Sequence, residues 1–404
     1  MTSIHQRLAE IDAAGLRRRL RLVESPMGPD VLLDGEPVLL LCSNDYLGLA
    51  GDPRVREAAA AAAMRWGGGA GSSRLVSGHM TPHAEFEARL AAFKGSEAAL
   101  LFGSGYLANV GVLSALAPTG TIFSDALNHA SIIDGCRLAR AQTQVYRHND
   151  VAHLGELLAR TAPTHPKLIV TDGVFSMDGD VAPLREIEAL AREHGALLVV
   201  DDAHGTGAIG PGGRGAVAAA GIRADVVVGT LGKALGSYGA YVACDRAMAD
   251  LLLNTARSFI FSTGLPPASV AAAQAALEIL EAEPERPLRL IANADLLRAE
   301  LGLPPAATQI VPLIIGSPEA AVAASERALA GGVFAQAIRP PTVPAGTSRI
   351  RAALMATHTE DQVRHAADVL RNSIGLCVTS NSPADRHSAT SSAVPASATA
   401  TRLR

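Results

Sequence analysis

The chain has 404 residues, of which 48% are hydrophobic and 18% charged, with a formal net charge of −4. This is enough apolar sequence for a large core and for two or three domains, and the near balance of charge, without a long basic block, argues against nucleic-acid or anionic-membrane binding. The four cysteines show neither a CxxC pair nor a metal-ligand spacing, so we expect reduced thiols and no metal site. No apolar run approaches the roughly 18 residues that span a bilayer, and together these features predict a cytoplasmic protein.

The predicted elements divide the chain into four segments. Residues 1–45 combine an amphipathic helical arm with a hairpin that turns at Asp34–Gly35, and residues 46–275 alternate short apolar strands with helix-forming stretches. Apolar runs without period-two alternation are typical of strands buried on both faces, so we expect an α/β fold with a mostly parallel sheet in this large domain. A smaller C-terminal α+β domain is predicted over 276–378, and the Ser-, Thr-, Ala- and Pro-rich residues 379–404 predict a disordered tail.

Short apolar runs bounded by turn residues mark the predicted strands of both domains. After the last of them a helix is expected to begin at Thr359, because Gln362 lies three residues further on and completes a capping box. The predicted strands are 98–102, 121–125, 167–173, 196–202, 225–230 and 240–244 in the large domain, and 310–316 and 348–356 in the small one.

Clusters of glycine and polar residues follow several predicted strands. Ligands of an open parallel sheet bind at the carboxyl ends of its strands, so these clusters are the candidate site. The helix start in FGSGYLAN could hold a phosphate on its backbone N–H groups, although it lacks the Gly-Lys-Ser/Thr of a nucleotide P-loop. The clusters are FGSGYLAN (102–109), DGVFSMDGD (172–180), DDAHGTG (201–207) and TLGKALG (230–236).

The DDAHGTG and TLGKALG clusters favour pyridoxal 5′-phosphate (PLP) over a dinucleotide. Gly205–Gly210 matches GxGxxG, but DDAH separates it from the strand and PGGRG follows where a helix should begin, so we reject NAD binding. Lys233 lies in a glycine-flanked turn one strand from an acidic residue, which suits a lysine that binds PLP and a carboxylate that keeps its ring nitrogen protonated. Taken singly, Lys233 could be a surface lysine and His204 a structural histidine; together the groups favour a cofactor site.

Several motifs in order along the chain resemble the α-oxoamine synthases, from about residue 15 to about residue 375. The resemblance implies a fold-type-I, aspartate aminotransferase-like PLP-dependent transferase that works as a homodimer with active sites at the subunit interface. Members of the family condense an amino acid with an acyl thioester and release carbon dioxide and free thiol. The motifs are SNDYLGL (43–49), GSSRLVSG (71–78), VFSMDGD (174–180), DDAHGTG, TLGKALG and AIRPPTVPAGTSRIR (337–351).

The resemblance implies roles for the residues that match the family motifs. Lys233 would carry the cofactor and act as acid and base, and Asp201 would pair with the ring nitrogen. Strand alternation should point Asp202 to the opposite face. His204 would hydrogen-bond the phenolic oxygen of the cofactor, and His129 would stack on its ring and assist proton transfer, although by itself His129 looks like an ordinary histidine at a helix start.

Further residues would complete the cofactor site by the same resemblance. Gly105 and Tyr106 would bind the phosphate through backbone N–H groups, and Thr230 would add a hydroxyl. Ser176 would contact the side of the ring. Thr263, with Ser262, would reach the phosphate from the partner subunit, although the segment alone looks like a loop before a proline-started helix.

Arginines are the candidates for holding the substrate carboxylates, because the planar guanidinium binds a carboxylate at two points. The resemblance implies that Arg351 holds the carboxylate of the amino acid and that Arg17 and Asn44 also bind substrate. Arg349 lies at the alternate position of the same strand and could instead form a salt bridge. Arg17 has arginine neighbours at 18, 19 and 21, so a merely solvated basic face is about as plausible.

The residues of two motifs, AIRPPTVPAGT and VFSMDGD, resemble most closely the branch of the family that joins L-alanine to a pimeloyl thioester in biotin biosynthesis. Whether the acyl carrier is CoA or acyl-carrier protein stays open. Relatives that use glycine with acetyl-CoA or succinyl-CoA, or serine with palmitoyl-CoA, share the same machinery and remain alternatives. An aminotransferase or lyase of the same fold is a further alternative. A non-catalytic protein that only keeps the fold is another, and the intact Lys233, Asp201 and His204 argue against that one.

Overall fold

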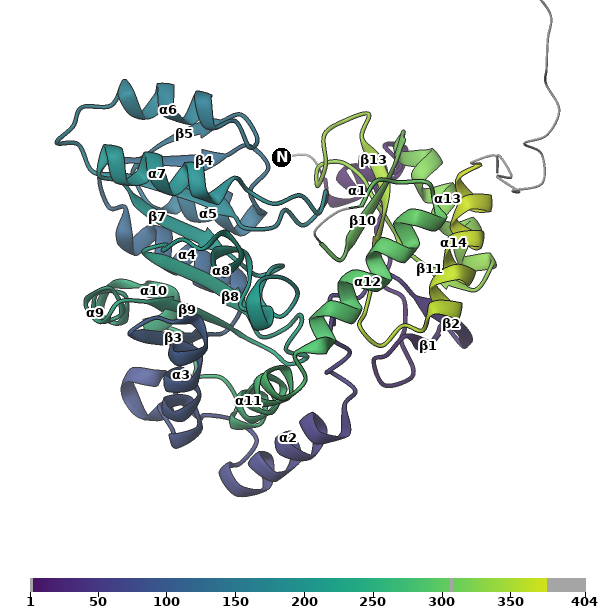
Figure 1. Cartoon of the computed structure of the whole chain (residues 1–404), viewed down its shortest axis with the longest axis horizontal. Helices are drawn as coiled ribbons and strands as arrows, with labels where there is room; N and C mark the ends of the chain where they lie inside the picture. The colour runs from purple at the N-terminus through teal and green to yellow at the C-terminus, as the bar shows by residue number, and fades with distance from the viewer. Residues whose placement is uncertain (1–2, 306–307, 376–404) are drawn as a thin grey trace, which may run out of the picture.

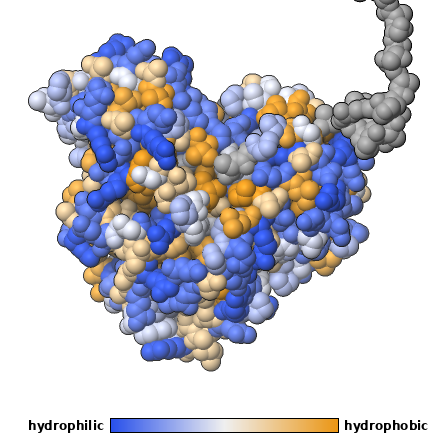
Figure 2. All heavy atoms as spheres, viewed as in Figure 1, coloured by the Kyte–Doolittle hydropathy of each residue, from blue (hydrophilic) through white to orange (hydrophobic). Residues whose placement is uncertain are grey.

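The computed structural model describes residues 3–305 and 308–375, so the predicted tail, 379–404, lies outside the described residues. The chain forms two parts that meet along a seam (Figure 1). One is built on a seven-stranded sheet, and the other on two three-stranded sheets with their helices. Apolar residues gather along the seam, while polar residues cover most of the remaining surface in the same view (Figure 2).

The large sheet has the strand order β3-β9-β8-β7-β6-β4-β5. Neighbouring strands from β8 to β5 run parallel, and β9 runs antiparallel to both β8 and β3, so the sheet is mostly parallel, as predicted. Its strands are β3 (Ala98–Phe102), β4 (Thr121–Asp125), β5 (Gln142–Tyr146), β6 (Lys167–Asp172), β7 (Leu197–Asp201), β8 (Val226–Thr230) and β9 (Ala240–Cys244).

Helices cover both faces of this sheet, which is why its central strands are apolar on both sides. Along β7, Leu198 and Val200 pack into the core beneath α3, α6, α7 and α11, whereas Val199 packs into the core beneath α4, α5 and α9. The helices of this part are α2 (Pro53–Trp66), α3 (Thr81–Lys94), α4 (Gly105–Leu116), α5 (Ala130–Leu138), α6 (Val151–Ala159), α7 (Leu184–His194), α8 (Ala216–Ala220), α9 (Arg246–Thr255), α10 (Arg257–Ile260) and α11 (Pro267–Ala282), with short helical turns η1 (Arg74–Gly78) and η2 (Pro211–Gly213).

The smaller part joins segments from both ends of the chain. The sheet β10-β13-β12 is antiparallel, and the sheet β1-β2-β11 combines the N-terminal hairpin with a strand from the C-terminal region. The predicted hairpin turn is present, with both Asp34 and Gly35 at positive φ. The elements are α1 (Ile4–Ala13), β1 (Asp30–Leu33), β2 (Glu36–Leu40), α12 (Glu285–Glu300), β10 (Ile310–Gly316), α13 (Pro318–Ala330), β11 (Val333–Phe334), β12 (Gln336–Ile338), β13 (Ser348–Ala353) and α14 (Glu360–Ile374).

Every predicted strand is confirmed to within a few residues, and Thr359 and Gln362 form the predicted capping box. The strands β5, β11 and β12 were not predicted. β5 is a polar edge strand in which only Tyr146 is buried, and β11 and β12 have two and three residues, so none shows an apolar pattern. Within the described ranges, no helix has the length and apolar character needed to cross a membrane.

Candidate active site

The candidate site lies where the parallel strands β6, β7 and β8 end beside one another. Asp172 ends β6 and is paired in register with Asp201, which ends β7, and Thr230 ends β8. Because these carboxyl ends meet at the same edge of the sheet, the loops that follow them converge. The predicted clusters after these strands therefore belong to a single site.

Lys233 lies in the turn after β8, in a loop that packs closely on the chain at Leu49–Ala50. Gly236 in this turn has a φ of +57°, and a Cβ there would lie 2.4 Å from the Ala50 nitrogen, so the turn requires glycine. The amine of Lys233 lies 2.8 Å from Nε2 of His204. Burial lowers the pKa of Lys233 to about 8, although Asp201 and Asp172 oppose that shift.

His204 connects Lys233 to a buried hydrogen-bonded chain. Its Nδ1 lies 2.6 Å from the hydroxyl of Tyr46, which donates to Asn44 (3.0 Å) and accepts from Arg351 (3.2 Å). Because Tyr46 has a single hydrogen and gives it to Asn44, Nδ1 of His204 is the donor to Tyr46, and Nε2 is left to accept from Lys233. Burial, followed by the positive charges of Lys233 and Arg351, holds the pKa of His204 well below its usual value, so the ring is neutral.

Asp201 and Asp202 point to opposite faces, as the strand alternation predicts. The carboxylate of Asp201 accepts from the amide of Asn109 (2.6 Å) and from the Ala203 N–H (2.9 Å). Asp202 turns away and forms an ion pair with Lys94 (2.9 Å). Asp201 is buried, and in the described part of the chain no cation pairs with it, so a positively charged ligand group would be stabilised beside it.

His129 precedes α5 and its position is fixed from two sides. Its backbone N–H donates to Asp172 (2.8 Å), and its Nδ1 lies 2.7 Å from the hydroxyl of Ser131, which also accepts from Asn109. Burial lowers the pKa of His129; the nearby Asp201 opposes this shift and Lys233 adds to it. His129 is therefore close enough to Asp201 and Lys233 to interact electrostatically with both.

The start of α4 carries Gly105 and Tyr106. Ser104 caps the helix by accepting from the Leu107 N–H (3.2 Å), and the Tyr106 hydroxyl is turned away to Asp134. A Cβ added at Gly105 would meet nothing within 4 Å, and no described hydrogen bond uses the backbone N–H of Gly105 or Tyr106. A helix N-terminus favours anions. Thr230, at the end of β8, holds the loop ends together by donating to the Gly239 carbonyl (3.1 Å).

The residues present fit PLP. The cofactor needs an amine for its aldehyde, an anion for its ring nitrogen and donors for its phosphate. Lys233 supplies an amine with a lowered pKa, Asp201 a buried carboxylate without a cation, and the α4 N-terminus free N–H groups.

Arg351 is brought to the same site from β13 of the smaller part. Its Nε donates to the carbonyl of Ser176 (2.5 Å), and its terminal nitrogens contact Asn44 (3.3 and 3.4 Å) and Tyr46. Ser176 therefore meets Arg351 through its backbone. The neighbouring Arg349 forms an ion pair with Asp178, which is the alternative considered for it from the sequence.

Arg17 and Thr263 lie outside this cluster. Arg17 belongs to the N-terminal arm, where it is half exposed and pairs with Asp12 (3.4 Å). Thr263 forms a backbone bridge to Ser73, beside the glycine-rich segment 66–78. Among the contacts of the described residues, none joins either side chain to Lys233.

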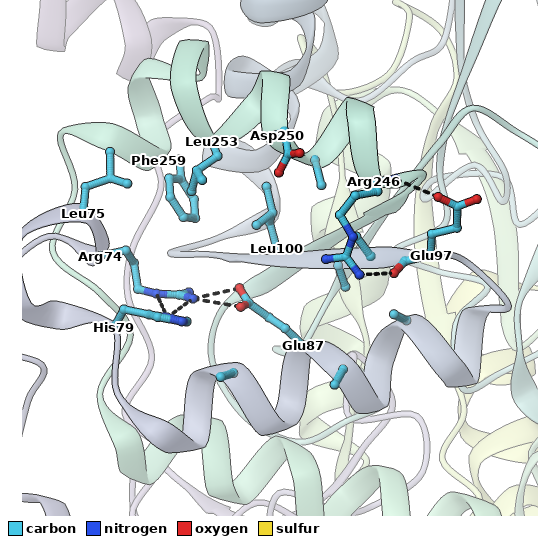
Figure 3. A pocket seen from close by; sticks show the side chains of 16 residues that line it. Arg74, Leu75, His79, Glu87, Glu97, Leu100, Arg246, Asp250, Leu253 and Phe259 are labelled. Atoms are coloured by element: carbon cyan, nitrogen blue, oxygen red, sulfur yellow. Dashed lines mark hydrogen bonds and ion pairs between the residues drawn. The ribbon is translucent and has the colours of Figure 1, made fainter.

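A cavity of about 400 Å³ lies elsewhere, between α3, β3 and α9 (Figure 3). Arg74 points across it to Glu87 (2.9 Å), with His79 beside it, and Arg246 bonds to Glu97. None of the predicted site residues lines this cavity. Arg74 and Glu87 form an ion pair there, and none of the three lysines lines the cavity, so it offers no counterpart to the Lys233 site.

Comparison with known proteins decides among the branches. The model of the aminotransferase class I and II family matches residues 36–370. The 8-amino-7-oxononanoate synthase of Anaeromyxobacter dehalogenans strain 2CP-1 is 54% identical over 364 residues, which cover 88% of this chain and 91% of that protein. The chain belongs to the 8-amino-7-oxononanoate synthase family. It is therefore a PLP-dependent acyltransferase of the α-oxoamine synthase group, with the fold-type-I architecture expected from the sequence.

Solved structures support the same fold. A serine palmitoyltransferase (SPT) with PLP has a TM-score of 0.87 and 34% identity, covering 93% of this chain and 98% of its own. An 8-amino-7-oxononanoate synthase from Francisella tularensis has a TM-score of 0.72 and 26% identity, covering 84% of this chain and 98% of its own. Of these two structures the palmitoyltransferase has the higher TM-score and the higher identity, whereas the 54% identical relative described above is an 8-amino-7-oxononanoate synthase.

Two residues of this synthase site were not singled out from the sequence. Asn109 orients Asp201, and Tyr46 connects Arg351 to His204. Both stand inside motifs that were recognised, FGSGYLAN and SNDYLGL, so the signal was present. Their partners come from distant parts of the chain, which a motif does not identify.

The lowered pKa of Lys233 gives a prediction for the cofactor-free protein. The sequence has three lysines: Lys167 is buried, the Lys94 side chain is 3% exposed and paired with Asp202, and Lys233 is half-buried. Because only the unprotonated amine is nucleophilic, acetylation of Lys233 by acetic anhydride should rise about tenfold per pH unit and level off above about pH 8. Peptide mass spectrometry measures this rate; a rise that continues to pH 10 would contradict the lowered pKa.

Proposed function

We propose that this protein joins L-alanine to a pimeloyl thioester and forms 8-amino-7-oxononanoate, carbon dioxide and free thiol. The observation that carries the proposal is the 54% identity to an 8-amino-7-oxononanoate synthase over 91% of that protein. The geometry agrees with it, because an arginine for a carboxylate, a lysine amine and a buried carboxylate converge at the strand ends.

When bound, PLP supplies an electron sink for the carbanion that forms at Cα of the amino acid. Asp201, oriented by Asn109, would hold the proton of the ring nitrogen, and His129 would lie against the ring. The N-terminus of α4 at Gly105 and Tyr106, with Thr230, would bind the phosphate. These assignments rest on the buried carboxylate of Asp201 and the free helix N-terminus.

Lys233 would move the proton at Cα of the amino acid. A lysine with a pKa of about 8 is present in both protonation states near neutral pH, so it can accept that proton and return it later. His204 keeps the amine in place at 2.8 Å, and because its own ring is neutral it adds no competing positive charge.

Arg351 would bind the carboxylate of alanine, with Asn44 and Tyr46 beside it. The acyl chain has a candidate route in a cavity of about 260 Å³, which lies next to His129 and Ser176 between the two parts of the chain. The lining of this cavity includes Asn128, Ile133, Phe175, Met177 and the loop 341–344. Arg17 would bind the acyl substrate from the N-terminal arm.

The proposal extends to a cytoplasmic homodimer. Support comes from large apolar side chains that are exposed near the glycine-rich segment and near Thr263: Val76 (79% exposed), Leu75 (51%) and Phe261 (71%). A second copy of the chain would bury them and bring Thr263 to the neighbouring phosphate site. Light scattering after gel filtration tests the dimer, and a monomer at micromolar concentration would overturn it.

Product mass is the test of the reaction. The PLP-loaded protein is mixed with L-alanine and pimeloyl-CoA or pimeloyl-acyl-carrier protein, and in parallel with glycine and acetyl-CoA and with serine and palmitoyl-CoA. We expect the mass of 8-amino-7-oxononanoate from alanine alone. Product only from glycine or serine would keep the chemistry and refute the substrate assignment, and the two pimeloyl carriers, compared by kcat/KM, identify the donor.

A further inference from the structure

A second cluster of charged residues lies beside the candidate site, at the ends of β4, β5 and β6. His148, which follows β5, places its Nδ1 2.9 Å from Asp125 and its Nε2 2.8 Å from Asp180. Asp125 ends β4, and Asp180 lies in the loop after β6. The imidazole of His148 therefore bridges a carboxylate at the end of β4 and a carboxylate in the loop after β6.

The two carboxylate contacts favour an imidazolium ring for His148. Ionised carboxylates only accept hydrogen bonds, so both ring nitrogens have to donate, which requires both to carry a proton. Burial works against the charge, but the hydrogen bonds to Asp125 and Asp180 outweigh it and raise the pKa of His148 to about 10. The ring of Phe175 packs edge to face against the His148 ring, with 4.4 Å between the two ring centroids, and limits the movement of His148.

Asn149 reinforces the bridge. It has a φ of 53°, in the left-handed region that asparagine tolerates, and this conformation lets its backbone N–H reach Asp125 (2.9 Å) while its side-chain amide reaches Asp180 (2.7 Å). Two adjacent residues thus bind the same pair of carboxylates.

The loop that Asp180 belongs to, residues 173–182, is the one that meets Arg351. Its base is closed by backbone hydrogen bonds, Phe175 N–H to Asp180 and Ala182 N–H to Gly173. Its outer part faces the smaller domain, where the Ser176 carbonyl accepts from Arg351 (2.5 Å). His148 holds the base of this loop to the large sheet, and the arginines of β13 hold its outer part.

We propose that His148 is a positioning residue for the amino acid substrate. By fixing Asp180 to Asp125, it sets the place of loop 173–182 and, through the Ser176 carbonyl, the direction in which Arg351 presents its guanidinium. The inference rests on the proposed function, in which Arg351 binds the alanine carboxylate. His148 touches neither Arg351 nor Lys233 in any described contact, so its effect is on geometry.

The first test is His148→Gln, which removes the charge and one of the two donors. Titrating the absorbance of the PLP-loaded protein with L-alanine measures the dissociation constant without any acyl substrate. We expect it to rise about tenfold or more, because a displaced Arg351 would lose its charge-assisted contact with the alanine carboxylate. PLP retention and the KM for pimeloyl-CoA should change less than about twofold, well below that tenfold loss.

A matched control is His153→Gln, since His153 accepts from the Arg147 N–H in the same connection but contacts neither carboxylate. It should leave alanine binding unchanged. If both variants weaken alanine binding equally, the connection matters only for local folding and the proposal is wrong. If the wild-type protein binds no alanine, the proposed function fails instead, so the two failures are distinguishable.

Asp180→Asn gives a second, milder variant, because the Asp180 side chain is 37% exposed and the amide is the same size. It should raise the dissociation constant of alanine as His148→Gln does. The double variant should be no worse than either single one, because both break the same link. Additive losses would show that His148 acts by another route and would overturn the proposal.

Discussion

Lys233→Ala is expected to fold, to lose the visible absorbance of lysine-bound PLP, and to lose turnover by at least about 10²–10⁴-fold, the range for removal of an acid–base group. The loss follows from the position of Lys233, whose amine lies at the ends of β7 and β8 beside His204 and has a pKa of about 8. Neither Lys94 nor Lys167 can replace it. Lys94 is locked to Asp202 on the other face, and Lys167 donates to the Pro163 and His165 carbonyls.

Absorbance spectra and single-turnover product formation measure the two losses separately. Lys167→Ala is the matched control, because it removes the same atoms from a buried lysine at the opposite end of β6. It should keep the cofactor absorbance and activity even if the melting temperature falls. A Lys233→Ala protein that stays yellow and active would place the cofactor lysine elsewhere and remove the basis of the proposed function.

The strand ends that carry chemistry were predictable from local sequence. Asp201 follows the apolar residues 196–200, and Lys233 lies five residues after the apolar run 226–228; neither run has period-two alternation. Parallel strands place such ends together whatever the rest of the chain does. The opposite directions of Asp201 and Asp202 follow from the same geometry. For these residues, local pattern and fold class were sufficient.

Contacts between distant segments were not predictable in this way. Arg351 reaches Ser176 and Tyr46 across more than 170 residues of sequence, and its direction depends on how the two parts of the chain meet. The small strand β11, which pairs with the N-terminal hairpin, has two residues and carries no periodicity. His148 stands in a polar connection, and only the fold shows that it bridges Asp125 and Asp180.

The placement of Arg351 leads to the second large effect. Arg351→Ala is expected to raise the KM for L-alanine by about 10- to 100-fold, since a hydrogen bond to a charged group contributes about 1.5–3 kcal/mol and each 1.4 kcal/mol is about tenfold. Arg351 is buried, so in the variant the carboxylate of alanine would lose its charged partner at a position where water cannot fully replace that interaction. The KM for the pimeloyl thioester should change far less.

Arg351→Lys separates charge from shape. Lysine keeps the positive charge but has no planar fork, so it cannot contact both Ser176 and a substrate carboxylate in the way proposed for Arg351, and we expect an intermediate KM. Arg364→Ala, which removes an exposed arginine paired with Glu300 and Glu360, controls for general loss of charge and should leave the KM unchanged. If Arg351→Ala binds alanine as tightly as the wild-type protein, the carboxylate is held elsewhere. In that case the hydrogen-bonded chain from Arg351 through Tyr46 to His204 would serve the architecture of the site and have no part in substrate binding.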